Sequence, residues 1–181
     1  IDNNVASPAH GILLTSPSDM GVNASQTISG QIVDDQNNPV LIQGLTVRLS
    51  DVSGLGNLSD VVLTSDSSGQ FQTTYSTYQE AGQVEIIASS VGLDQGSASF
   101  NILADQASKN IVLTSSPMEL RVDGTMQSLI LLTLEDDYGN LLQDSGVLID
   151  FTGHDLTGGS LSTAAVTTDA NGRGYTVYYA S

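Results

Sequence analysis

The sequence predicts an all-β protein built from two tandem β-sandwiches, of which the second is incomplete. Gly and Asx residues punctuate the chain about every eight to twelve residues, a spacing typical of sandwiches with short strands. The segments between them alternate or are rich in β-branched residues, and one sequence pattern occurs twice. Because no segment has a sustained 3.6-residue apolar repeat, helix is expected over a turn or two at most.

The repeated pattern links residues that lie 99 to 103 positions apart. The paired landmarks are Ile12–Ser16 with Ile111–Ser115, Asp34–Asp35 with Asp136–Asp137, Asp66 with Asp169, and Gly69 with Gly172. Repetition at the length of a domain indicates similar modules in series, not one catalytic domain. The expected organisation is a linker over 1–9 that follows a preceding domain, a first domain over 10–103, a linker over 104–109, and a second domain over 110–181.

The strands of the first copy follow from its apolar runs. In the segment 83–88, Val84 and Ile86 should point inward and Glu85 outward, which is the period of two that a half-buried strand requires. The expected strands span 12–15, 27–33, 45–50, 61–64, 70–75, 83–88 and 97–103.

The second copy stops before it is finished. A spacing of 103 residues places Ser181 opposite Tyr78, so the segment 79–103 and its two strands have no counterpart. Two such strands would contribute on the order of 10 kcal/mol of apolar burial, and a whole domain is stable by only about 5 to 15 kcal/mol. We therefore expect outside completion, either by the polypeptide continuing past Ser181 or by strands from a neighbouring chain in a filament. The linker-like start favours continuation.

Composition excludes several classes of partner. Four Lys and Arg residues stand against 20 Asp and Glu residues, for a formal net charge of −16. Such a surface repels nucleic acid and anionic membrane, so we expect neither nucleic-acid binding nor direct membrane insertion. Divalent cations and basic partners are favoured instead. The absence of cysteine excludes disulfides, thiolate metal sites and cysteine nucleophiles.

Three sequence blocks carry a family resemblance. The blocks are 31–40 with its second copy 134–142, 64–71 with its second copy 167–174, and 81–88, which occurs once. Together they resemble the bacterial immunoglobulin-like repeats of invasin and intimin type adhesins. The resemblance implies tandem immunoglobulin-like β-sandwiches without enzyme activity, acting as a rigid stalk or adhesive module of a bacterial surface protein or filament. Its partners would be neighbouring immunoglobulin-like domains or subunits of the same protein and a host or environmental surface ligand.

The residues of the turns also predict their conformation without the family resemblance. Asp66 and Asp169 should open turns by accepting backbone N–H groups, while Gly69 and Gly172 supply the left-handed conformation. The family's Gly-Asn-Pro turn is altered to 37–39 in the first copy and 139–141 in the second. Both variants keep a residue that tolerates positive φ.

Acidic pairs at equivalent positions are the candidate metal ligands. Oxygen ligands on loops suit calcium, which takes six to eight of them. The candidates are Asp34, Asp35, Asp136 and Asp137, with Asp105 near the domain junction. The alternative, which we favour because no ligand ladder of EF-hand spacing is present, is that these residues are solvated strand ends and Asx turns. No cofactor is required by either interpretation.

The remaining candidates are weaker. His10 and His154 are distant from each other in loop contexts, so ordinary exposed histidines are favoured over catalysis or zinc. The tyrosines of 75–78 and 175–179 are expected in core and cross-strand packing, with 178–179 a candidate interface. The loop 153–160 is the candidate for direct recognition of glycan or protein. An accessory module of a secreted enzyme is a further alternative.

Overall fold

The computed structural model describes residues 8–120, 126–151 and 158–180, in which all fifteen elements are β-strands. The expected all-β class is confirmed. The chain divides into two compact units, Ile1–Leu103 and Ala104–Ser181. The segment 104–109 is therefore grouped with the second unit.

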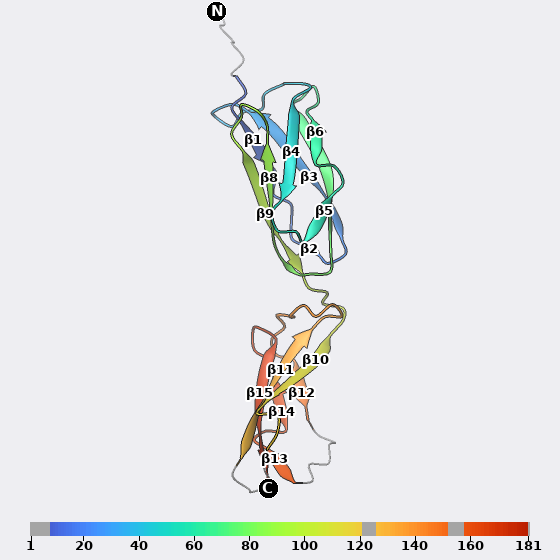
Figure 1. Ribbon diagram of the computed structural model, residues 1–181, viewed down its shortest axis with the longest axis vertical. Helices are drawn as coiled ribbons and strands as arrows, with labels where there is room; N and C mark the ends of the chain where they lie inside the picture. Colours follow the sequence, from blue (N-terminus) through green and yellow to red (C-terminus); the bar gives the residue numbers. More distant parts are fainter. Residues whose placement is uncertain (1–7, 121–125, 152–157, 181) are drawn as a thin grey trace, which may run out of the picture. The chain divides into compact units, whose positions relative to one another are not determined.

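The first unit is a complete two-sheet sandwich (Figure 1). One sheet has the order β1-β3-β7-β5 and the other has the order β2-β9-β8-β4-β6. The strands are β1 (Gly11–Leu14), β2 (Met20–Gly21), β3 (Ser25–Val33), β4 (Thr46–Asp51), β5 (Gly56–Leu58), β6 (Val62–Thr64), β7 (Gln70–Thr77), β8 (Gly82–Ser89) and β9 (Gly96–Leu103).

Side chains from the inner faces of both sheets form one core. In β8, Val84 and Ile86 are fully buried and Glu85 is exposed, which confirms the predicted period of two. Across the sandwich, the rings of Tyr75 and Phe100 pack edge to face with centroids 5.4 Å apart. This geometry is the favoured one for aromatic pairs.

Two short strands had no signal in the sequence. β2 contains two residues and β5 contains three, and each includes a glycine. Neither is long enough to show an alternation, and glycine has low strand propensity. β2 forms only by parallel pairing with β9, and β5 by antiparallel pairing with β7. Their existence depends on tertiary neighbours.

The second unit repeats the first sheet but has only two described strands in its second. The sheet order β10-β11-β15-β13 matches β1-β3-β7-β5, whereas the described residues of the facing sheet form β12 and β14 only. The strands are β10 (Asn110–Ser116), β11 (Gln127–Glu135), β12 (Leu148–Asp150), β13 (Gly159–Leu161), β14 (Ala165–Thr167) and β15 (Arg173–Ala180).

In one core pair, the large residue and the glycine lie on opposite strands in the two units. In the first unit Gly30 is paired with Phe71, and a Cβ on Gly30 would lie 2.2 Å from the Phe71 ring. At the matching pair in the second unit, the large residue is Leu132 on β11 and the glycine is Gly174 on β15. Each site holds one large side chain and one glycine, as close packing of the core requires.

The turn before the central strand is the same in both units. The Oδ1 atom of Asp66 accepts hydrogen bonds from the N–H groups of Ser68 at 2.8 Å and Gln70 at 2.9 Å. Gly69 has a φ of +74°, and its counterpart Gly172 has a φ of +66°. A Cβ on Gly69 would lie 2.0 Å from the Val40 carbonyl oxygen, so any other residue would force the backbone to shift.

This turn generates a stability prediction with an internal control. Gly69→Ala should lower the free energy of unfolding of the first unit by at least about 3 kcal/mol, since it combines left-handed strain with a backbone clash. Gly44→Ala should lower it by only about 1 kcal/mol, because Gly44 has a φ of +86° but open space around it. Urea unfolding measures both. Equal losses of unfolding free energy in the two variants would contradict the prediction, because the backbone would then relieve the clash at Gly69 without loss of stability.

Candidate functional site

Asp34 and Asp136 hold equivalent turns at the ends of β3 and β11. The Oδ1 atom of Asp34 accepts the N–H groups of Gln36 at 2.9 Å and Asn38 at 2.8 Å. The Oδ1 atom of Asp136 accepts those of Tyr138 and Asn140, both at 2.9 Å. The positive φ expected at each tip is confirmed, at +63° for Asn37 and +84° for Gly139.

Asp136 has an additional partner in the segment that connects the two units. Its Oδ2 atom accepts a hydrogen bond from the backbone N–H of Asp105 at 3.0 Å and one from the Asn140 side chain at 2.9 Å. The backbone N–H of Asp137 donates to Ser108 Oγ at 3.2 Å. The carboxylate that closes the turn therefore also binds the segment 104–109 to the second unit.

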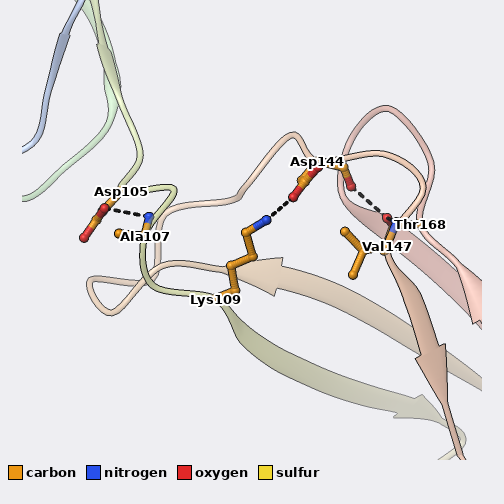
Figure 2. Close-up of polar contacts among 6 residues, drawn as sticks. All are labelled: Asp105, Ala107, Lys109, Asp144, Val147 and Thr168. Carbon is orange, nitrogen blue, oxygen red and sulfur yellow. Dashed lines mark hydrogen bonds and ion pairs between the residues drawn. The ribbon is translucent and has the colours of Figure 1, made fainter.

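Lys109 and Thr168 extend this network. Figure 2 shows the Lys109 ammonium group pointing at Asp144, with which it forms an ion pair. The buried Thr168 hydroxyl donates to the Asp144 carbonyl oxygen at 2.7 Å and accepts the Val147 N–H at 3.0 Å. In Figure 2 the turn at Asp105 is closed by its own bond from the Ala107 N–H at 2.9 Å.

The predicted calcium ligands occupy separate places. The structure brings Asp105 to Asp136, places Asp35 and Asp137 on the exposed outside of their turns, and uses Asp34 as a buried turn cap. Within the ranges that the structure describes, no three His, Cys, Asp or Glu side chains form a group that could hold a metal ion. Since the Asp136 oxygens already accept four hydrogen bonds, the geometry favours the turn interpretation. Calcium binding at these residues stays a prediction.

The electrostatics of Asp136 reflect the same contacts. Burial alone would raise the pKa of its carboxyl group, but hydrogen bonds from Asn140, Asp105 and Tyr138 outweigh burial and hold the pKa below its ordinary value of 3.8. A carboxyl pKa that is lower in the folded state stabilises the fold above the unfolded pKa. That stability is lost as the pH falls through the folded pKa.

Removal of this charge gives a prediction that depends on pH. Asp136→Asn should lower the free energy of unfolding of the second unit by about 1.5 to 3 kcal/mol at neutral pH, since charged hydrogen bonds are replaced by mismatched donors. The difference should shrink as the pH falls well below 3.8, because wild-type Asp136 then also becomes neutral. Hydrogen exchange of the β11 amides measures the effect. The exposed Asp35→Asn is the control, and a loss that is independent of pH would contradict the role of the charge.

The second unit also exposes part of its own core. Ile12 and Leu14 on β1 are 6% and 5% exposed, whereas their counterparts Ile111 and Leu113 on β10 are 49% and 52% exposed. The register places both pairs on the inner face of their sheets, beside Ile32 and Leu134. The difference arises because β8 and β9 cover this face in the first unit.

Other inner positions are also more exposed in the second unit than in the first. Val47 and Tyr75 are fully buried in the first unit, but their counterparts Ile149 and Tyr178 are half-buried. A cavity of about 260 Å³ lies along the inner side of the second unit, between Ser115, Ile130 and Tyr178. The inner face of the second unit is therefore an open apolar surface, which we call the open face. It is defined by Ile111, Leu113, Ile130, Ile149 and Tyr178.

The remaining candidate residues are placed as follows. The Nε2 atom of His10 lies 3.3 Å from Asp94 Oδ2, and both side chains are exposed. His154 and the other residues of 153–157 in the candidate recognition loop 153–160 lie outside the described residues. Tyr75 lies in the core, whereas Tyr175 and Tyr179 occupy cross-strand positions opposite Leu131 and Gln127 and are 67% and 44% exposed. These two side chains point to the outer side of the sheet because they alternate with buried Thr176 and Ala180.

The fold and its repeated turns define a pair of immunoglobulin-like β-sandwich domains in series. No family model matches the chain. No curated protein matches it in sequence. Among the described residues, no helix is long and apolar enough to cross a membrane.

Solved structures of bacterial proteins, one of them described as an adhesin, are similar to this chain. FdeC, described as a broadly conserved Escherichia coli adhesin, is 18% identical, with 96% of this chain and 56% of that chain covered and a TM-score of 0.52. Yersinia pseudotuberculosis InvD is 18% identical, with 92% of this chain and 48% of that chain covered and a TM-score of 0.57. The D0-D1 domain of intimin is 20% identical, with 96% and 85% covered and a TM-score of 0.44.

This chain spans about half the length of the FdeC and InvD structures. The similarity to FdeC and InvD confirms the immunoglobulin-like resemblance that the sequence indicated at the level of the fold.

Proposed function

We propose that this chain is a non-catalytic stalk segment of a bacterial surface protein or secreted filament, located outside the cell. The observation that carries the proposal is the pair of like units joined by a short segment that is hydrogen-bonded to the second unit. The fold shared with FdeC, an adhesin, supports the same class of role. A spacer of this kind provides reach and stiffness, and adhesion targets would be bound by other parts of the protein.

Stiffness is expected from the connecting segment. Only six residues, 104–109, separate β9 from β10, so the connection is short. Three contacts hold it to the second unit: Asp105 N–H to Asp136, Asp137 N–H to Ser108, and Lys109 to Asp144. A segment bound in this way has fewer accessible conformations than a free polar linker.

The stalk role can be tested by distance measurements between spin labels. The chain contains no cysteine, so Val91→Cys and Ala170→Cys place one label on an exposed position of each unit. The labelled chain should give a narrow distance distribution, and adding Ser108→Ala with Lys109→Ala should broaden it. Gln106→Ala, an exposed neighbour in the same segment, is the matched control. A distribution that is already broad in the starting protein would contradict the stalk.

The open face indicates how the second unit is completed. Its exposed apolar residues occupy the positions that β8 and β9 cover in the first unit. We therefore propose that two strands of the β8–β9 type complete the second sheet. The open face would accept such strands from the same polypeptide or from a neighbouring chain in a filament. A natural protein with an intact mass near 18.8 kDa and a stable second unit would favour the neighbouring chain.

A chimera tests whether the open face accepts strands. A copy of residues 79–103 placed directly after Ser181 continues the repeat in register. It should raise the free energy of unfolding of the second unit by at least about 3 kcal/mol through apolar burial and slow hydrogen exchange of β12. The control carries serine at the copied positions of Val84, Ile86 and Phe100, which are buried in β8 and β9. Equal stability of chimera and control would show that the open face does not dock these strands.

Direct recognition of a host or environmental ligand is the second candidate function. Its expected loop lies mostly outside the described residues, so the proposal depends on the sequence alone. A binding or accessory module would bind glycan or protein in the absence of other domains. Saturable binding of the purified chain to a glycan array or to host cells would favour it over a stalk.

A further inference from the structure

The outer face of the β10-β11-β15 sheet carries large apolar side chains in the second unit. Leu129 and Leu131 on β11 and Tyr175 and Tyr179 on β15 are exposed, and Val177 between the tyrosines is half-buried. The register pairs Leu129 with Val177 and Leu131 with Tyr175, so these five side chains are neighbours on one surface. We call this surface the outer apolar face.

The first unit shows that the fold does not require an apolar surface here. At the matching positions of β3 and β7, the first unit has small or amide side chains in the same register. The counterparts of Leu129, Leu131, Tyr175, Val177 and Tyr179 are Thr27, Ser29, Gln72, Thr74 and Ser76. Since both sheets have the same strand order, the apolar residues serve something other than folding of the sheet.

The outer apolar face is also independent of the open face. Successive side chains of a strand point to opposite sides of the sheet. Leu132 and Thr176 point inward and are buried, whereas their neighbours Leu131 and Tyr175 point outward. Strands that complete the second sheet would cover the inner side and leave the outer apolar face exposed.

Charge favours a second copy of the chain as the occupant. The net charge of −16 makes most approaches between copies repulsive. The outward-facing described residues of β10, β11 and β15 include one carboxylate, Glu135 on β11, and one cation, Arg173, at the same end of the sheet on β15. Because these two charges balance, two copies can approach through this surface with less repulsion than the net charge of the chain would give.

We propose that two copies associate through the outer apolar face with two-fold symmetry. With the axis across the strands, each strand lies antiparallel above the same strand of the partner. Leu129 of one copy then meets Leu131 of the other, and Tyr175 meets Val177. Arg173 and Tyr179 lie at opposite ends of the face on β15, so the same arrangement stacks each Arg173 on a Tyr179 ring. One surface thus supplies both halves of an isologous contact.

The size of the face predicts a weak dimer. Strand spacing and rise give the three strands a footprint of about 15 Å by 24 Å, on the order of 350 Å² per copy. A stable interface needs about 800 Å² per copy. We therefore expect a dissociation constant between about 10 μM and 1 mM, sufficient for neighbouring copies held at high local concentration.

Sedimentation equilibrium of the whole chain tests the proposal, in about 0.15 M salt to screen the net charge. The double variant Leu131→Ser with Tyr175→Gln installs the residues that the first unit has at these positions. It should weaken association at least about tenfold, since two large side chains leave the contact. Val91→Ser, which removes a 98% exposed valine elsewhere, should leave association unchanged. Thermal unfolding of each variant confirms that the fold is intact.

Three outcomes would overturn the proposal. The first is a wild-type chain that remains at 18.8 kDa up to about 1 mM. The second is an unchanged dissociation constant in the double variant. The third is association that persists in the double variant but is lost in Ile111→Ser, because the contact would then be made through the open face.

Discussion

The register of the central antiparallel pair, β3 with β7 and β11 with β15, is the constraint on which the rest of each unit depends. A slip of one residue would move every side chain to the other side of the sheet. Turns hold this register at one end of the pair. The Ile32 N–H donates to the Gly69 carbonyl oxygen at 2.9 Å, and the Leu134 N–H donates to Gly172 at the same distance. Gly69 precedes β7 and is bonded to β3, and Gly172 precedes β15 and is bonded to β11. Each turn therefore holds the two paired strands together.

With the register fixed, the same frame presents two different surfaces in the second unit. Its inner side is the open face, where Ile111 and Leu113 have no β8–β9 cover. Its outer side is apolar where the first unit is polar. The two surfaces are separated by one sheet, so one can take up completing strands while the other meets a second copy. A stalk module would use the first to fold and the second to associate laterally.

Local signals in the sequence predicted much of this fold. The Asp-x-x-Gly turns were predictable because Asp66 and Gly69 act through bonds within five residues. The short strands β2 and β5 were not predictable, because each forms on a neighbour distant in the chain. The acidic pairs were ambiguous, since a carboxylate that caps a turn and one that binds calcium look alike in sequence. The hydrogen bond from the Asp105 N–H to Asp136 joins residues 31 positions apart, so no local pattern could have indicated it.

By itself, the sequence determined the repeat, the all-β class and the turn chemistry, because each depends on spacing along the chain. The tertiary structure decided which side of the sheet each apolar residue occupies. From sequence, Tyr175 could belong to the core or to a cross-strand pair, and pairing of β15 with β11 places it outward while Thr176 is buried. Burial is a property of both neighbouring layers and not of one strand. Only the assembled sandwich could therefore distinguish a packed core from an open face and from a surface for association.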